Sequence, residues 1–233
     1  MRLYKIQNLI FLNMEEVSLF KKYGSNWKNI SAHKYLSESF IEKYKDKIHW
    51  LCISKKQELS ESFIEKFKNK VYWNYISEYQ KLSEKFIEKY EDYVNWACIS
   101  AYQKLSESFI ERHRNRVDWS CISRFQTLSE DFIEKFENEV YWCNISDYQK
   151  LSESLIEKYK DEVYWDYISS SQKLSEKFIE KYENNVDWKY ISISQKLSES
   201  FIEKYKNWVD WKNIFEYQKH LSPEFKNKYK HLI

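Results

Sequence analysis

Residues 59–81, LSESFIEKFKNKVYWNYISEYQK, are one copy of a unit that recurs every 23 residues along the chain. Eight leucines open the clear copies, from Leu36 to Leu197. Nine tryptophans keep the same spacing: Trp27, Trp50, Trp73, Trp96, Trp119, Trp142, Trp165, Trp188 and Trp211. A fixed period of roughly 20–50 residues is typical of repeat architectures, in which each unit stacks on its neighbours.

The first half of the unit predicts a short helix. Ser60 precedes it as an N-cap whose hydroxyl can accept a bond from a free backbone N–H group. Leu59 and Ile64 have the spacing of a hydrophobic staple. Phe63, Ile64 and Phe67 then form an apolar stripe at helical spacing.

The turn after this helix has to form without glycine, because Gly24 is the only glycine in the chain. We expect Asn69 to adopt the left-handed conformation that ends many helices, since asparagine tolerates it. The same is expected at the equivalent positions, Asp46, Asp92, Asn115, Asn138, Asp161, Asn184 and Asn207.

The second half of the unit predicts another helix, which begins at Trp73, with Val71 and Ile76 at staple spacing. The residue before the tryptophan is a good N-cap in some copies (Asn95, Asp118, Asp187 and Asp210) and a poor one in others (His49, Tyr72, Tyr141 and Tyr164). Each unit therefore reads as two helices of about eight residues, joined by turns of roughly three or four.

Helices this short are only marginally stable alone in water, so they have to stack on neighbouring copies. The sequence predicts an all-α fold, an α-solenoid of tandem 23-residue helix pairs. A β-helix, the competing short repeat, requires alternating apolar and polar residues, and SESFIEKFK does not alternate. The expected core consists of Leu59, Phe63, Ile64, Phe67, Val71, Trp73, Ile76 and their equivalents.

Three segments follow from the repeat. Residues 1–35 are expected to form an N-terminal cap with a degenerate first copy, and residues 36–220 eight tandem copies. Residues 221–233 are expected to form a capping half-copy. Terminal copies diverge because one of their faces meets water instead of a neighbour.

Three polar positions keep their residue type between copies. We interpret them as inter-copy hydrogen bonds and helix-end solvation, because a solenoid must satisfy its helix ends; a repeated binding surface is the alternative. The positions are those of Glu42, Glu65 and Glu88; of Lys43, Lys66 and Arg112; and of Gln57, Gln80 and Gln103.

Other positions vary between copies, in the turn between the helices and in the second helix. Such positions either drift freely in water or line a surface that fits a partner. Large apolar side chains recur there, which is typical of protein interfaces. The candidate partner-binding residues are Tyr75, Tyr93, Tyr167, Tyr190, Ile193 and Trp208.

Charge is unevenly distributed along the chain. Residues 1–127 carry a net charge of +6, and residues 128–196 carry −6. The basic part suggests an alternative function, binding of nucleic acid, RNA in particular, although the acidic copies interrupt any continuous basic stripe. The candidate anion or nucleic-acid contacts are Lys47, Lys70, Arg112, Arg114, Arg116 and Arg124.

Signals for catalysis are missing from the sequence. One glycine and one proline exclude glycine-rich phosphate loops, and neither a Cys-x-x-Cys pair nor a His-Glu-x-x-His pattern occurs. We expect no enzyme activity, no cofactor, no metal site and no catalytic residue, with four packed, free cysteines. No apolar run approaches the length of a membrane span and the start makes a poor signal peptide, so we expect a cytoplasmic location.

The unit resembles uncharacterised tandem repeats of the form LSExFIEKY…VDWxxIS in large DNA viruses, phages and low-G+C bacteria. The resemblance covers residues 36–220 and implies a repeat class, with no activity attached. We expect a monomeric or weakly oligomeric scaffold that binds another protein through its second-helix and turn positions. In a virus or phage, such a scaffold would act as an inhibitor that masks a host defence protein.

Overall fold

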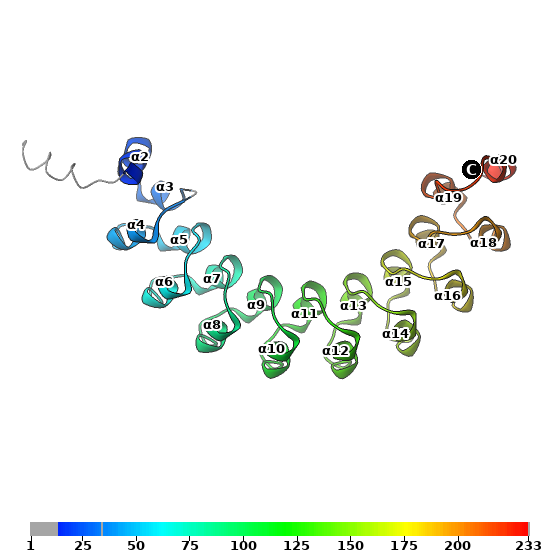
Figure 1. Ribbon diagram of the computed structural model, residues 1–233, viewed down its shortest axis with the longest axis horizontal. Helices are drawn as coiled ribbons and strands as arrows, with labels where there is room; N and C mark the ends of the chain where they lie inside the picture. Colours follow the sequence, from blue (N-terminus) through cyan, green and yellow to red (C-terminus); the bar gives the residue numbers. More distant parts are fainter. Residues whose placement is uncertain (1–13, 34, 233) are drawn as a thin grey trace, which may run out of the picture. The chain divides into compact units, whose positions relative to one another are not determined.

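The computed structural model describes residues 14–33 and 35–232. Within them, nineteen α-helices and one 3-10 helix follow one another, without a strand (Figure 1). The helices form regular 23-residue pairs, which confirms the predicted α-solenoid. Residues 1–13 of the predicted N-terminal cap lie outside this description.

Both helices of a copy are slightly shorter than expected. The first has six residues: α4 (Glu38–Lys43), α6 (Glu61–Lys66), α8 (Glu84–Lys89), α10 (Glu107–Arg112), α12 (Glu130–Lys135), α14 (Glu153–Lys158), α16 (Glu176–Lys181) and α18 (Glu199–Lys204). The second has seven: α5 (Trp50–Lys56), α7 (Trp73–Tyr79), α9 (Trp96–Tyr102), α11 (Trp119–Phe125), α13 (Trp142–Tyr148), α15 (Trp165–Ser171), α17 (Trp188–Ser194) and α19 (Trp211–Tyr217). The flanking elements are α2 (Met14–Tyr23), α3 (Trp27–Ser31), α20 (Pro223–Tyr229) and the 3-10 helix η1 (Lys230–Leu232).

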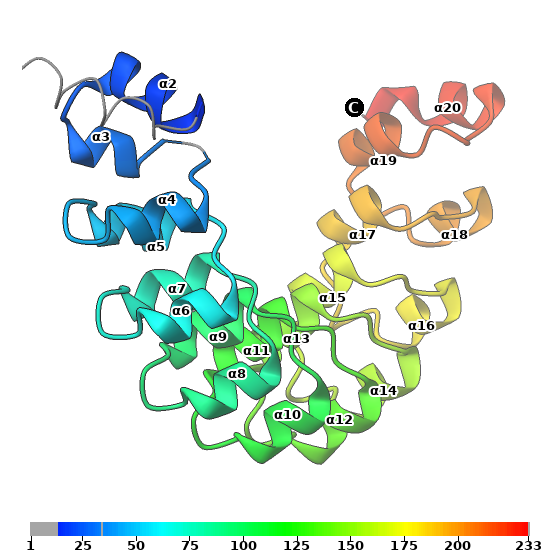
Figure 2. The ribbon, with the colours of Figure 1, turned by 60° about the vertical axis from the view of Figure 1, so that its left-hand side comes forward.

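The chain forms two compact units, residues 1–117 and 118–233. In the first unit, α3, α5, α7 and α9 pack side by side in one row. In the second unit, α11, α13, α15, α17 and α19 do the same. Two views show α16 and α18 in a separate row beside α15, α17 and α19 (Figure 1, Figure 2). Each unit is therefore a stack of helix pairs with a first-helix layer and a second-helix layer.

The core follows the predicted apolar positions. In the copy at residues 59–81, Phe63, Ile64, Val71 and Ile76 are buried, and their equivalents in the other copies are buried too. Trp73 differs, because it is only half-buried. Its ring centroid lies 5.1 Å from that of Tyr90 in the next copy. The tryptophan thus packs between successive copies at the edge of the core.

The N-caps form as the sequence predicts. The Ser60 hydroxyl accepts a hydrogen bond from the backbone N–H of Phe63 at 3.2 Å, and the equivalent serines do the same. At the second helix, Asn95, Asp118, Asp187 and Asp210 cap with their side chains. The side chains of His49, Tyr72, Tyr141 and Tyr164 make no capping bond, as expected from their chemistry.

The predicted left-handed turn residue is wrong. Among the described residues, no residue other than glycine has a positive φ. The N–H groups of Lys70 and Val71 both donate to the Phe67 carbonyl, at 2.8 and 3.1 Å, so the turn closes in right-handed conformation. Asn69 is exposed at the tip of this turn. The correction applies equally to Asp46, Asp92, Asn115, Asn138, Asp161, Asn184 and Asn207.

The C-terminal half-copy covers the last tryptophan. Ser222 caps α20, and Pro223 occupies its first turn, where a missing N–H costs nothing. Phe225 and Tyr229 pack on Trp211, with ring centroids 6.3 and 4.6 Å from it. Helix α20 therefore covers Trp211 in the way that the first helix of a following copy would.

Candidate protein-binding surface

The fixed glutamines bond successive copies together. Gln80 is buried, and its side-chain oxygen accepts from the N–H of Leu59 at 2.8 Å. Its side-chain nitrogen donates to the carbonyls of Ser54 and Gln57 in the preceding copy, at 3.1 and 2.7 Å. In the second unit, Gln149, Gln172 and Gln195 bond in the same way. The interpretation of this position as an inter-copy hydrogen bond is confirmed.

The fixed glutamates and basic residues form ion pairs on the first helices. Lys89 Nζ lies 2.5 Å from the carboxylate of Glu65 in the preceding copy. The hydrogen bond from Lys89 holds the pKa of Glu65 below its usual range, and the same bond raises the pKa of Lys89. Equivalent pairs join Lys66 to Glu42, Arg112 to Glu88, Lys158 to Glu134, Lys181 to Glu157 and Lys204 to Glu180. Because the charged side chains at these two fixed positions pair between copies, the variable positions are the better candidates for a partner site.

The variable turn position covers the tryptophan of the preceding copy. Tyr93 and Trp208 are 48% and 47% exposed, yet one side of each ring is packed. Their centroids lie 5.2 Å from Trp73 and 5.7 Å from Trp188, respectively. In other copies Lys47 and Lys70 lie over Trp27 and Trp50, at 5.7 and 6.0 Å. These two candidate aromatic residues are therefore exposed but held in place.

The second-helix face carries a cluster of one cation and two rings in the first unit. Tyr75 is half-buried, and its centroid lies 6.2 Å from that of Tyr79, one turn later. Lys55, from the preceding copy, places its Nζ 5.3 and 5.4 Å from the two centroids. The candidate Tyr75 thus belongs to a surface that spans two copies.

The last position of the second helix is the feature that the sequence reasoning missed. It is aromatic in five of the eight copies, and all five side chains are 47 to 60% exposed. The available signal was its place four residues after Tyr75, on the same helix face. We call these residues the aromatic row: Tyr79 and Tyr102 in the first unit, and Phe125, Tyr148 and Tyr217 in the second.

The remaining aromatic and aliphatic candidates lie on second helices of the second unit. Tyr167 is half-buried, 6.4 Å between centroids from Tyr164. The electrostatic influence of the neighbouring Cys143, followed by burial, raises the pKa of Tyr167 above its ordinary value. Tyr190 is exposed and Ile193 is half-buried on α17. Within the second unit, these three residues lie in the same helix layer as Phe125, Tyr148 and Tyr217 of the aromatic row.

Three of the six predicted basic contacts pair with a carboxylate of the preceding copy. Arg112 pairs with Glu88 at 2.7 Å, and Arg116 pairs with Asp92 at 3.1 Å. Lys70 likewise pairs with Asp46, at 2.7 Å. Arg124 lies over Phe125 and Tyr148, with centroid distances of 5.1 and 4.8 Å, and Arg114 is exposed. Ion pairing reduces the attraction that these groups offer to a polyanion, because the preceding copy already supplies the carboxylates.

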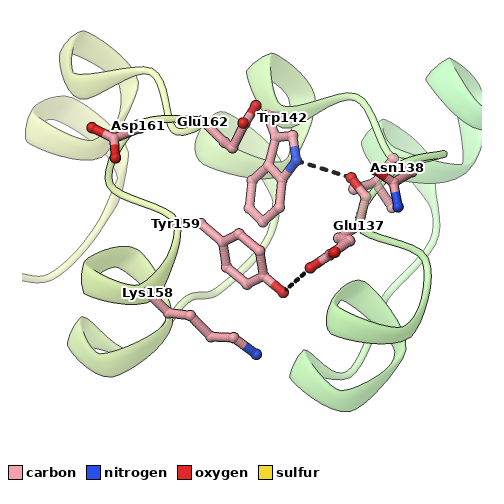
Figure 3. A pocket seen from close by; sticks show the side chains of 8 residues that line it. Glu137, Asn138, Trp142, Lys158, Tyr159, Asp161 and Glu162 are labelled. Atoms are coloured by element: carbon pink, nitrogen blue, oxygen red, sulfur yellow. Dashed lines mark hydrogen bonds between the residues drawn. The ribbon is translucent and has the colours of Figure 1, made fainter.

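A cavity of about 430 Å³ lies beside Trp142 in the second unit (Figure 3). The Trp142 indole N–H donates to the Glu137 carbonyl at 3.1 Å, and the Tyr159 hydroxyl donates to the Glu137 carboxylate at 2.6 Å. Glu162 and Lys158 also line the cavity, whereas no histidine, cysteine or serine does. The Glu137 carboxylate, the Tyr159 hydroxyl and the Lys158 ammonium group of this lining are engaged in bonds between copies.

Neither a metal-binding cluster nor a membrane-spanning helix occurs within the described ranges. Residues 14–33 and 35–232 contain no group of three acidic, histidine or cysteine side chains placed to hold a metal ion. None of the helices that the structure describes is long and apolar enough to span a bilayer. The four cysteines are half-buried, and none of them forms a disulfide within the described residues.

Comparison of the chain with protein-family models, curated proteins and solved structures finds no match.

Proposed function

We propose that the chain is a non-enzymatic scaffold that binds another protein through the exposed face of its second helices and the adjoining turns. The observation that supports this most is the aromatic row, whose rings are about half exposed at one repeated position. Tyrosine, tryptophan and phenylalanine are enriched at protein interfaces, because they bury a large area when a partner docks.

The packing of these rings supports the proposal further. Tyr93 and Trp208 rest on tryptophans of the preceding copy, and Tyr75 and Tyr79 rest against Lys55. Side chains held in this way lose little rotational freedom when they bind, so more of the contact energy appears as affinity.

The experiment is affinity capture with the tagged full chain, from a lysate of the cells in which the protein acts, with and without nuclease. The test variant replaces Tyr102 and Tyr148 of the aromatic row with serine. The matched control replaces Lys85 and Lys177 with serine, because both side chains are exposed on first helices, α8 and α16, outside the proposed surface.

We expect a captured protein that resists nuclease, survives in the control variant and is lost in the test variant. Three results would overturn the proposal: no protein captured by the intact chain, capture abolished by nuclease, or equal behaviour of the two variants. The second result would favour nucleic acid, the alternative partner.

The resemblance to viral and phage repeats leads to a narrower proposal, in which the partner is a host defence protein that the scaffold masks in the cytoplasm. Identification of the captured protein by mass spectrometry tests it. A partner encoded beside the scaffold itself would contradict the masking role.

A further inference from the structure

A lysine follows the buried glutamine in six of the eight copies, and all six side chains are exposed. Five of these lysines leave the helix in the same way, because the preceding glutamine has φ near −92° and ψ between 145° and 154°. Lys219 differs, since Gln218 has a ψ of 71°. We call the five regular residues the lysine edge: Lys81 and Lys104 in the first unit, and Lys150, Lys173 and Lys196 in the second.

The positive charges of the lysine edge are not paired with carboxylates among the described residues. None of its five side chains makes an ion pair or a hydrogen bond with another residue among those that the structure describes. The first helices of the second unit show the opposite behaviour, because Lys158, Lys181 and Lys204 each pair with a glutamate of the preceding copy. The fold thus pairs the first-helix lysines with carboxylates, whereas the lysines of the edge remain available to an external anion.

The register between copies sets the spacing of these charges. Gln172 donates to the Gln149 carbonyl and Gln195 to the Gln172 carbonyl, each at 2.7 Å, directly before the three lysines of the second unit. Packed helix layers lie roughly 8–10 Å apart. A segment in the extended polyproline II conformation rises about 3.1 Å per residue with three residues per turn, so every third side chain returns to the same face after about 9 Å. Carboxylates at every third residue of such a segment therefore match the lysine edge.

Three lysines of the edge, Lys81, Lys104 and Lys150, follow a residue of the aromatic row by two positions, whereas Lys173 and Lys196 follow Ser171 and Ser194. In the first unit, Tyr79 and Lys81 line one hollow of about 370 Å³, together with Glu58, Leu59 and Ser60. A segment that lies along Lys81, Lys104 or Lys150 meets an aromatic ring beside an ammonium group, a combination that suits a peptide with both acidic and apolar side chains.

Charge in the second unit favours a peptide over a nucleic acid. Residues 118–233 carry four more acidic than basic residues. Asp147 on α13 and Glu153 on α14 lie three residues before and three residues after Lys150 in the sequence. A nucleic acid carries a phosphate on every nucleotide and meets these carboxylates as well as the lysines. A peptide can carry its carboxylates only where the lysines lie.

We propose that the lysine edge binds an extended acidic segment of the protein partner, with carboxylates opposite Lys150, Lys173 and Lys196. This inference rests on the proposed scaffold function and names the chemistry of its partner.

The test uses a fluorescein-labelled peptide with glutamate at every third position between serine and tyrosine, and measures its anisotropy on the full chain. The edge variant combines Lys150→Glu, Lys173→Glu and Lys196→Glu. The control variant combines Lys160→Glu, Lys177→Glu and Lys206→Glu, which changes the net charge equally at exposed lysines of the same unit. We expect the edge variant to bind about tenfold more weakly or worse, and the control variant to bind within about twofold of the intact chain.

Two further arms complete the test. A peptide of the same composition, with its glutamates grouped at one end, is expected to bind more weakly. A single-stranded RNA of similar charge is expected to bind more weakly than the spaced peptide. Lys→Gln replacements at the edge, with circular dichroism of each variant, separate lost binding from lost folding.

The inference is overturned if the spaced peptide does not bind, if both charge variants lose affinity equally, or if RNA binds more tightly with the same dependence on the edge. It is also overturned if the edge variant still captures the cellular partner at full strength. In that last case the scaffold function stands and only the acidic segment fails.

Discussion

Replacing Gln172 with methionine removes one inter-copy hydrogen-bonding group while nearly preserving side-chain volume. The Gln172 side-chain oxygen accepts from the Leu151 N–H at 3.0 Å. Its nitrogen donates to the carbonyls of Ser146 and Gln149, at 2.9 and 2.7 Å. The side chain is 5% exposed, so water has little access to the groups that methionine would leave without this partner.

The magnitude follows from the cost of burying polar groups without partners. Each hydrogen bond contributes about 0.5–1.5 kcal/mol net, and a buried donor left without an acceptor costs about 1–3 kcal/mol. The Ser146 and Gln149 carbonyls can accept hydrogen bonds from other donors, so the full cost does not apply to them. We expect the free energy of unfolding to fall by about 2–4 kcal/mol in total. Lys173→Met, at the next and exposed position, is expected to stay within about 0.5 kcal/mol of the parent chain.

Urea unfolding followed by circular dichroism measures the overall loss. Amide hydrogen exchange gives the local one, since each copy contacts only its neighbours. The Leu151 amide is expected to exchange at least about tenfold faster in the Gln172→Met variant. The reasoning is refuted if Leu151 keeps its protection, or if the two methionine variants unfold at the same urea concentration.

Three further outcomes are expected. Ser169→Ala removes the buried hydroxyl that accepts from the Asp187 N–H at 2.9 Å, and is expected to cost about 1–3 kcal/mol; an unchanged urea midpoint would contradict the role of this serine. Tyr164→Asp supplies the side-chain cap that α15 lacks and Asp187 gives to α17, so we expect a gain of about 0.5–1 kcal/mol, read as a higher Tm. The Lys228 hydrogen bond lowers the pKa of Glu203 below its ordinary 4.5, so its stabilisation is present above that pH and lost as pH falls through the folded-state pKa. When the pH is lowered from neutral to about 3, the free energy of unfolding is accordingly expected to fall less for the Lys228→Gln chain than for the parent. Equal falls for the two chains, measured by urea unfolding at both pH values, would disprove this.

Most of the fold was predictable because its causes are local. Serine caps, apolar stripes and the contrast between Asp187 and Tyr164 act within one helix turn, so a single copy shows them. The turn after the first helix was predicted wrongly at Asn69, because its right-handed closure depends on two bonds to the Phe67 carbonyl and not on the residue type at the tip.

The candidate site was less predictable, because it depends on the register between copies. Arg116 looks like a free cation in the sequence, but stacking brings it to Asp92, 24 residues away. Tyr79 was missed because the comparison of copies favoured positions that vary most in chemistry, whereas this position is mainly aromatic. Only the three-dimensional stack shows that it is exposed.

The glutamine bonds have a consequence for the evolution of chain length. Each glutamine reaches only the copy before it, and the acceptors it meets are the same in every regular copy. If residues 151–173 were excised, Gln195 would meet the Ser146 and Gln149 carbonyls that Gln172 now meets. Unequal recombination between near-identical segments can thus lengthen or shorten the protein, and every glutamine side chain of a regular copy still finds its acceptors in the copy before it. The number of copies, and with it the length of the surface, can therefore change between generations while the residues of each copy stay the same.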